Sequence, residues 1–207
     1  MAKKSFKPGE MLSPLPAVMV SCGSGSEKNI LTIAWTGIIN SDPPMTYISV
    51  RKSRYSHDII EKNGEFVINL PTEDLVFQTD WVGVKSGRDH DKFKETGLTP
   101  LECEKVTCPM IAESPVNLEC RVVQKTELPS HDMFMAEIVA VHINEELIDP
   151  KGRFMLENAG LVAYVHGEYY GLKSKPLGRF GHSVMKPSTR KRKAGERRAA
   201  QRQKKRR

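Results

Sequence analysis

The sequence predicts a mainly β protein whose antiparallel sheet closes into a barrel, with a few short helices at its ends. Six or seven short runs rich in β-branched and aromatic residues follow one another along the chain. Most intervals between them are too short for a helical crossover, so neighbouring strands must run antiparallel. Glycine and proline separate these runs, as expected where turns join strands.

The first half of the chain carries four strand signals and one helix signal. Apolar, β-branched runs between turn residues predict strands at 17–22, 30–35, 45–50 and 66–70. A helix is predicted over 56–63, because Ser56 is a suitable N-cap and Gly64 can end the helix.

The second half begins with a predicted helix over 72–81, which Thr72 would cap. The polar stretch 86–97 predicts a loop with one helical turn. Alternation at 116–122 predicts a strand buried on one face. The continuous apolar run at 133–143 predicts a long strand covered on both faces, and a short strand should follow at 161–165.

Length and composition indicate a single folded domain. The chain has 207 residues, of which 39% are hydrophobic and 28% charged, which excludes wholesale disorder, collagen and coiled coil. No apolar run reaches the roughly 18 residues that a membrane helix needs. The basic N-terminus is not followed by a signal-peptide core and cleavage site. We therefore expect a cytoplasmic protein that makes no membrane contact.

Charge is unevenly divided along the chain. From Lys186 onward there are 12 Lys and Arg residues and one acid, whereas residues 1–185 carry a net charge of −4. The tail lacks large apolar residues, so it should be disordered when free. We expect one domain over 1–185 and a disordered basic tail over 186–207. The tail can contact nucleic-acid phosphates without sequence preference, or can simply stay solvated.

Cysteine and histidine spacing gives no support for a metal site. None of the cysteines forms a C-x-x-C pair, and no two histidines have metal-ligand spacing on one helix face. We expect no metal and reduced, mostly buried thiols. The cysteines are Cys22, Cys103, Cys108 and Cys120.

The basic run at 51–56 lies between a predicted strand end and a predicted helix start, which is a good place to bind phosphate. Arg51 offers a planar fork, Ser53 and Ser56 offer hydroxyl groups, and the helix start adds free N–H groups and a positive dipole end. A solvated basic turn with a helix cap is the alternative. The sequence contains no P-loop and no Rossmann fingerprint.

Small and polar residues share one face of the segment 29–37. Thr32, Ala34 and Thr36 would let a flat ligand lie against the backbone, whose N–H and C=O groups can read its edge. The alternative is the solvent face of an edge strand. Of the histidines, His131 at a strand start is best placed to touch a ligand, and a surface histidine in a hairpin turn is the alternative.

Conventional catalytic signatures are absent from the sequence. There is no nucleophile elbow, no catalytic cysteine signature and no carboxylate pair whose spacing indicates glycoside chemistry. Enzyme action would therefore have to come from a cofactor.

Four segments, in this order, resemble the flavin reductase-like, FMN-binding split-barrel family, the group that includes flavoredoxins. They are NILTIAWTG at 29–37, SVRKSRYSHDII at 49–60 with EFVINLP at 65–71, SGRDHDKF at 86–93, and HGEYYGLKSKPLGRFG at 166–181. Their order and spacing together are fairly specific. The resemblance covers roughly residues 8 to 183 and leaves out the basic tail.

The resemblance implies a six-stranded antiparallel Greek-key split barrel, a homodimer, and FMN held near the dimer interface. It places the flavin ring along Thr32, Ala34, Trp35 and Thr36. Around the ribityl phosphate it places Ser49, Arg51, Ser53, Tyr55 and Ser56, and it makes Asn29 and Val50 cofactor-binding as well. Ser86, Gly87 and Lys92 would close over the cofactor. His131, the candidate catalytic residue, would approach the flavin together with Tyr169 or Tyr170.

The resemblance thus implies an FMN-binding oxidoreductase that draws electrons from NADH or NADPH and has flavin or ferric-type reductase activity. A flavoredoxin-like electron-transfer protein that does not use nicotinamide productively is one alternative. A nucleic-acid-binding module acting through the basic tail is an alternative of another class, and a barrel that has lost its flavin is a third. Because the flavin itself carries the hydride chemistry, the first two interpretations need no acid–base constellation.

Overall fold

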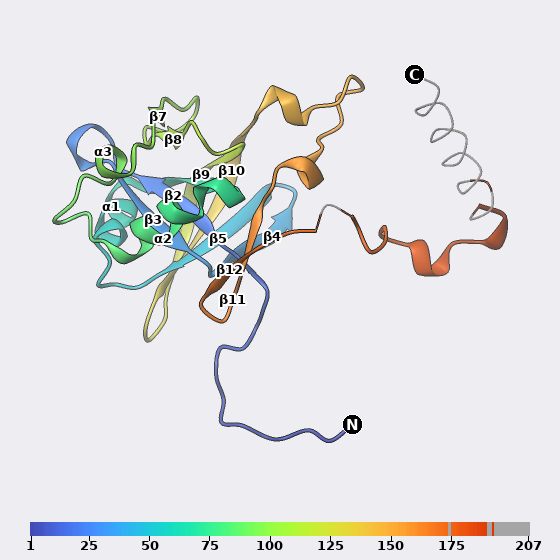
Figure 1. Cartoon of the computed structure of the whole chain (residues 1–207). Helices are drawn as coiled ribbons and strands as arrows, with labels where there is room; N and C mark the ends of the chain where they lie inside the picture. The colour runs from blue at the N-terminus through green and yellow to red at the C-terminus, as the bar shows by residue number, and fades with distance from the viewer. Residues whose placement is uncertain (174, 190–191, 193–207) are drawn as a thin grey trace. The chain divides into compact units, whose positions relative to one another are not determined.

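Residues 1–173, 175–189 and 192 are described by a computed structural model, and seven strands of this part of the chain pair into one antiparallel sheet (Figure 1). The strands are β2 (Val18–Cys22), β3 (Asn29–Ile33), β4 (Thr36–Ser41), β5 (Pro44–Val50), β6 (Glu65–Leu70), β9 (Val116–Glu127) and β10 (Asp132–Ile143). Their spatial order is β3-β2-β6-β9-β10-β5-β4. β9 and β10 separate β5 from β6, which is a Greek-key arrangement. The predicted mainly β, antiparallel fold is confirmed.

The sheet curls on itself because its two end strands are consecutive in the chain. β3 and β4 stand at opposite ends of the strand order, yet only Ala34 and Trp35 join them. Side chains from both ends of the order meet in one interior cluster, in which Leu31 of β3 packs with Ile48 of β5 and with Phe66 of β6. The barrel is therefore closed at a seam by the covalent chain, and no ladder between β3 and β4 occurs in the described sheet.

Helices cover the outer face of the barrel and one of its ends. These are α1 (Tyr55–Asn63), α2 (Val76–Val84) and α3 (Lys92–Thr96). Met19 of β2 and Ile30 of β3 pack in one cluster with Val82 of α2 and Phe93 of α3, separate from the interior cluster. Figure 1 shows α2 and α3 beside these strands. Ile59 and Ile60 of α1 belong to the interior cluster instead. No helix in the described part of the chain is long and apolar enough to span a bilayer.

Smaller elements complete the structure. β1 (Leu15–Pro16), β11 (Val162–Val165) and β12 (Glu168–Gly171) form a three-stranded sheet in the order β1-β11-β12, and β7 (Pro100–Leu101) pairs with β8 (Met110–Ile111). Short 3-10 helices lie at Gly25–Glu27, Glu73–Leu75, Glu145–Leu147, Leu156–Asn158 and His182–Val184. The chain divides into two compact units, Met1–Leu172 and Lys173–Arg207, and every sheet belongs to the first.

Several local predictions differ from the structure. The segment predicted as one strand at 30–35 ends at Ile33 and turns at Ala34 and Trp35 into β4, so the sheet has seven strands where the resemblance implies six. Ser56 is not the N-cap of α1; Arg54 is, and the Ser56 hydroxyl accepts a hydrogen bond from Asn29 Nδ2 at 2.7 Å. The helix predicted over 72–81 begins as a 3-10 turn and continues as α2.

The prediction that β9 is buried on one face only is wrong. Glu119 and Asn117 are also buried, because the segment around Val106 and Cys108 covers the outer face of the strand. The Glu119 carboxylate has no exposed surface and accepts hydrogen bonds from the backbone N–H groups of Glu104 at 2.9 Å, Lys105 at 2.6 Å and Val106 at 3.1 Å. Its other hydrogen-bond partner is His142.

These bonds decide the charge state of Glu119. Burial alone would raise the pKa of the carboxyl, but the hydrogen bonds from the backbone and from His142 outweigh it and hold the pKa below its usual range. Glu119 is therefore a carboxylate that the fold stabilises, and it anchors the 104–106 segment to β9.

Replacing Glu119 by glutamine should lower the free energy of unfolding by about 1–3 kcal/mol at neutral pH, since an amide NH2 would face backbone donors. Folding lowers the pKa of Glu119, so its ionised form stabilises the folded state. This contribution to the free energy of unfolding is complete above the ordinary glutamate pKa of about 4.3, and it is lost as the pH falls through the lower pKa of the folded state. Urea unfolding between pH 7 and 3 measures this, with exposed Glu102→Gln as the control. A difference between wild type and E119Q that stays constant over this range would contradict the assignment.

Candidate functional site

Two cavities adjoin each other where the seam of the barrel meets the start of α1. The first has a volume of about 420 Å³ and the second about 290 Å³, and Leu31, Arg51 and Arg54 line both. The first lies along Ala34 and Trp35, the residues that close the barrel. The second lies at the corner where β5 passes into α1.

The first cavity is a slot between the seam and α2. Thr32, Ala34, Trp35 and Ser49 form the barrel side, and Gly83 of α2 lies opposite. A Cβ at Gly83 would lie 2.9 Å from Thr32 Cβ, so only glycine lets the helix approach this closely. Such a slot suits a flat ring that contacts both backbone and side chains.

Aromatic side chains complete this slot. Trp35 is 38% exposed, and its ring lies 4.5 Å from the His131 ring, centroid to centroid. Tyr164 and Tyr169 come from the β11–β12 hairpin. Burial, aided by the charge of Arg51, lowers the pKa of His131, so its imidazole is neutral at pH 7. A flat ligand would therefore meet an uncharged aromatic wall.

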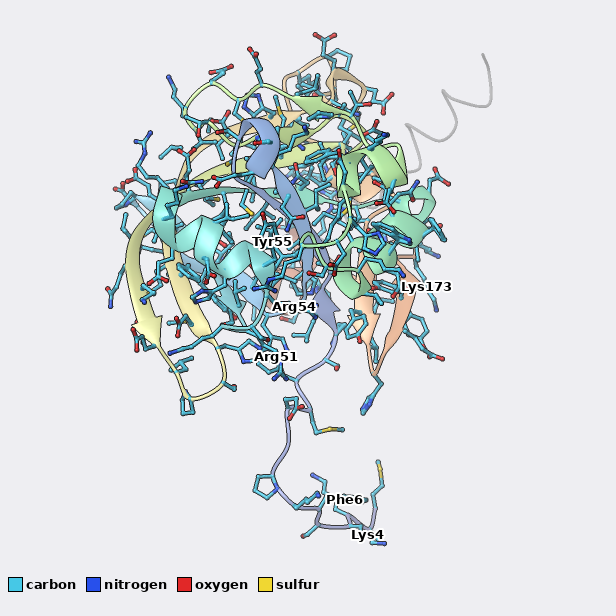
Figure 2. The ribbon with its side chains drawn as sticks, turned by 90° about the vertical axis from the view of Figure 1, so that its left-hand side faces the viewer. Lys4, Phe6, Arg51, Arg54, Tyr55 and Lys173 are labelled. Atoms are coloured by element: carbon cyan, nitrogen blue, oxygen red, sulfur yellow. The ribbon has the colours of Figure 1, made fainter. Side chains whose placement is uncertain are left out.

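The second cavity is strongly cationic. Among the described residues that line it there is no carboxylate, whereas five are cations: Arg51, Arg54, Lys85, Arg88 and Lys92. Ser53 and Ser56 add hydroxyl groups, and no side chain caps the N-terminus of α1. Figure 2 shows Arg51, Arg54 and Tyr55 following one another at this corner. The donor set fits a phosphate group.

Lys92 is a buried cation at the back of the second cavity. It is 4% exposed, and its Nζ donates to the backbone carbonyls of Ile30 and Val82, both at 2.7 Å. Burial, with the nearby charge of Arg54, lowers the pKa of Lys92 to about 8, although Cys22 acts in the opposite direction. Lys92 thus titrates just above physiological pH, which makes its charge sensitive to what occupies the cavity.

Gly87 fits closely into the wall of the second cavity. A Cβ at this position would overlap Asn29 Oδ1 and would lie 2.7 Å from Tyr55 Cδ1. Asn29 in turn holds the Ser56 hydroxyl. The loop after α2 is therefore packed directly onto the start of α1, and its backbone can close over a bound group.

A buried hydrogen bond links α1 to the sheet next to both cavities. His57 Nε2 lies 2.9 Å from Asp132 Oδ2, and Lys52 Nζ lies 3.3 Å from Asp132 Oδ1. Burial would raise the pKa of Asp132, but the hydrogen bonds from His57 and Lys52 outweigh it and lower the pKa. The pair ties α1 to the start of β10, next to His131.

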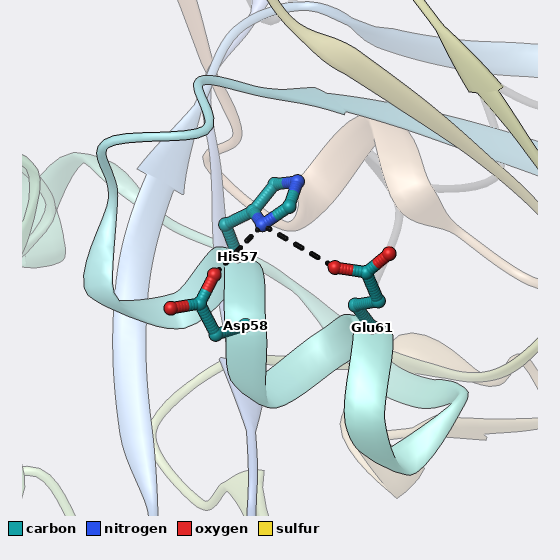
Figure 3. Close-up of side chains that lie close together, drawn as sticks. All are labelled: His57, Asp58 and Glu61. Carbon is teal, nitrogen blue, oxygen red and sulfur yellow. Dashed lines mark hydrogen bonds and ion pairs between the residues drawn. The ribbon is translucent and has the colours of Figure 1, made fainter.

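The other ring nitrogen of His57 faces acidic residues of its own helix. Nδ1 lies 3.0 Å from Asp58 Oδ1 and 3.9 Å from Glu61 Oε2 (Figure 3). In the described part of the chain, His57, Asp58 and Glu61 each place one atom that could bind a metal within 4.8 Å of the others. However, Asp58 and Glu61 are exposed, and the second ring nitrogen of His57 is already hydrogen-bonded to Asp132. We therefore assign no metal to it.

The structure brings most of the sequence-predicted site residues together. The first cavity is lined by Thr32, Ala34, Trp35, Ser49, Val50, Arg51, His131 and Tyr169. The second is lined by Asn29, Arg51, Ser53, Tyr55, Ser56, Ser86, Gly87 and Lys92. Thr36 and Tyr170 line neither cavity. The Thr36 hydroxyl donates to the Tyr47 carbonyl, and the exposed Tyr170 hydroxyl donates to Glu168.

Other lining residues escaped the sequence reasoning. Arg54 lies inside the basic run, and Lys85 and Arg88 flank the predicted Ser86-Gly87 pair. Positive charge next to these predicted site residues was therefore the sequence signal that could have identified all three. Asp80 and Tyr164 reach the first cavity only through the packing of α2 and β11, which no local pattern indicates.

Comparison with known proteins gives one consistent result. The sequence model of the Flavin reductase like domain matches residues 11–173. Flavoredoxin of Desulfovibrio vulgaris (Miyazaki F) superposes with a TM-score of 0.82 at 29% identity, covering 89% of this chain and 100% of that one. Flavoredoxin from Methanosarcina acetivorans gives 0.77 at 28% identity, with the same coverage. An uncharacterized protein of Archaeoglobus fulgidus is 36% identical over 143 residues, which is 69% of this chain and 80% of the relative.

Lys92 should make phosphate binding depend on pH. Its pKa of about 8 means that it loses its charge as pH rises from 7 to 9, so affinity for ribose 5-phosphate should fall about tenfold. The ligand stays a dianion there, since its second pKa is about 6. His131 stays neutral and the Cys22 thiol, with a pKa of about 12, stays protonated.

Calorimetric titration of the ligand-free protein measures this affinity. Lys92→Met should bind more weakly with a flat pH profile, and Lys94→Met, an exposed lysine of the same helix, should match wild type. If K92M and wild type show parallel pH profiles, Lys92 does not contact the anion.

Proposed function

The chain belongs to the flavin reductase-like family of flavin-binding redox proteins, and we propose that it is an FMN-dependent oxidoreductase that takes electrons from NADH or NADPH and passes them to a flavin or ferric-type acceptor. One observation carries the proposal: a slot for a flat ring adjoins a cation-lined cavity across a shared wall that contains Arg51. FMN joins the same two chemical features, a ring and a phosphate monoester.

The residues present fit this cofactor. Arg51, Ser53, Ser56, Lys92 and the uncapped start of α1 supply the charge-assisted hydrogen bonds that a phosphate dianion needs. The close approach of Gly87 to Asn29 and Tyr55 closes this cavity around a bound group. The flat slot takes the ring, with backbone polar groups of the seam at its edge.

Each part of the slot then has a definable task. Bound flavin supplies the hydride chemistry. Trp35 and His131 provide an apolar, uncharged wall that orients the ring and excludes water. The Tyr169 hydroxyl donates to Asp80 at 3.4 Å, and burial, with the Asp80 charge, raises the pKa of Tyr169 to about 12. Tyr169 therefore stays protonated and donates its one O–H proton to Asp80 at the rim, which leaves the phenol oxygen as an acceptor.

We also propose that the protein works as a homodimer in the cytoplasm. Trp35, Ile38 and Ile39 form an exposed apolar row on the seam and β4, with exposed fractions of 38%, 69% and 46%. Such a row beside the ring slot suits a surface that a second copy covers. The cysteines Cys22, Cys103, Cys108 and Cys120 are free, which suits a reducing compartment.

Two other functions stay open to test. One is a flavoredoxin-like electron-transfer protein that does not use nicotinamide productively, which the likeness to two proteins named flavoredoxin brings into consideration. Polyanion binding by the basic tail stays a prediction from charge alone, because residues 190–191 and 193–207 lie outside the described part of the chain. We expect truncation after Met185 to remove any such binding and to leave flavin content unchanged.

The double substitution Arg51→Ala, Ser53→Ala should give folded protein with weakened FMN binding. Loss of these charge-assisted bonds should cost about 2–4 kcal/mol, or some 30- to 1000-fold in affinity. Flavin absorbance after gel filtration and a fluorescence titration measure the effect. Lys62→Ala, at the far end of α1 from this corner, is the control. A double variant that retains FMN as wild type does would refute the phosphate assignment.

FMN-loaded protein should oxidise NADH or NADPH in the presence of free FMN or a ferric complex, and the R51A/S53A variant should do so at a greatly reduced rate. Loss of reduced-nicotinamide absorbance under steady-state conditions measures this. The proposed donor would be wrong if the loaded protein accepts electrons from dithionite and passes them on, but never consumes either nicotinamide nucleotide. That result would establish the electron-transfer alternative.

A further inference from the structure

The second cavity holds more positive charge than one phosphate monoester can neutralise. Its described lining contains five cations and no carboxylate. A phosphate monoester carries a charge of about −1.5 to −2 at pH 7. Cations gathered around a single such group repel one another, and further negative charge bound among them relieves that repulsion.

These cations fall into an inner and an outer set. Lys92 is buried against β3 and α2 and marks the inner end of the cavity, and Arg51, although exposed, lies on the wall shared with the first cavity, so we take these two as the inner phosphate site. Arg54 donates to the Gly83 carbonyl at 3.1 Å and bridges the corner to α2. Lys85 and Arg88 are exposed and follow the end of α2 at Val84, so they form the outer set at the mouth of the cavity.

Arg88 is held in place by residues of the cavity itself. Its guanidinium donates to the Ser53 carbonyl at 3.2 Å and lies over the Tyr55 ring, 5.5 Å from the centroid. Its backbone N–H donates to Ser86 Oγ at 3.2 Å. The guanidinium is thus fixed by neutral groups, and its other N–H donors have no partner among the described residues.

Neither outer cation is neutralised by the protein. Within the described residues, no carboxylate forms an ion pair with Lys85 or with Arg88, so both cations are left to solvent or to a ligand. A fixed guanidinium fork beside an unpaired lysine is the donor arrangement that recognises phosphate oxygens.

We propose that Lys85 and Arg88 bind a second phosphate group, next to the monoester held by the inner set. The inference rests on the proposed function, because it takes the inner set as the FMN phosphate site. Two molecules bring such a group: a flavin adenine dinucleotide, through the second phosphate of its diphosphate, and a nicotinamide adenine dinucleotide that docks beside the bound flavin. In both cases the ligand class is a dinucleotide.

The test compares Arg88→Gln and the double variant Lys85→Gln, Arg88→Gln with wild type. Equilibrium titrations measure affinity for FMN and for FAD with ligand-free protein, and for NADP⁺ and NAD⁺ with FMN-loaded protein. Lys94→Gln, an exposed lysine outside the cavity, is the matched control, and Arg88→Lys shows whether the fork or only the charge matters.

FMN affinity should change less than twofold in these variants. A loss of about tenfold or more in FAD affinity assigns the second phosphate to the flavin, and the same loss for NADP⁺ or NAD⁺ assigns it to the nicotinamide nucleotide. Unchanged affinity for all four ligands overturns the proposal. An equal loss for FMN also overturns it, since Lys85 and Arg88 would then belong to the first phosphate.

A wild-type protein that binds neither flavin would contradict the proposed function instead. In that case the NADP⁺ and NAD⁺ titrations are repeated on the ligand-free protein with the same variants. They still decide whether the outer set binds a dinucleotide phosphate.

Discussion

The arrangement of both cavities depends on one buried hydrogen bond, between His57 and Asp132. Asp132 is 1% exposed and begins β10, where it pairs in register with Val50, the last residue of β5. A carboxylate at such depth depends on its partners, and removing one partner of such a pair costs several kcal/mol. The bond at 2.9 Å therefore fixes α1 against the point where β5 turns into the basic corner. The helix start, the corner and His131 are positioned together.

The site divides recognition between two kinds of surface. The ring slot is walled largely by aromatic and small side chains, with Arg51, Arg54 and Asp80 also lining it, whereas the adjoining cavity holds five cations and no carboxylate among its described lining residues. Residues 1–185 carry a net charge of −4, so this concentration of arginine and lysine stands out against a mildly acidic domain. Local positive potential in an acidic domain guides an anionic ligand to one place and discourages adhesion elsewhere.

Sequence reasoning located what depends on local chemistry. Alternating β-branched runs predicted the strands, and the basic corner at 51–56 was recognisable because a strand end, hydroxyl residues and a helix start follow one another directly. The turn at Ala34 and Trp35 was missed, since nothing in NILTIAWTG separates a continuous strand from two strands with a bend. The burial of Glu119 was missed because its hydrogen-bond donors lie in a loop 13–15 residues away. Tyr164 enters the slot through tertiary packing alone.

The seam between β3 and β4 has a thermodynamic consequence. Elsewhere in the barrel, ladder hydrogen bonds must break together before strands separate, but at the seam only the chain and side-chain packing join the two sheet ends. A ligand in the first cavity contacts β3 on one side and Ser49 and Val50 of β5, the neighbour of β4, on the other, and so adds contacts across this gap. Ligand binding in the first cavity and opening of the barrel at the seam are then coupled equilibria. Each tenfold increase of the ligand concentration above its dissociation constant raises the free energy of opening by about 1.4 kcal/mol. Amide hydrogens near the seam would report that coupling through slower exchange with solvent.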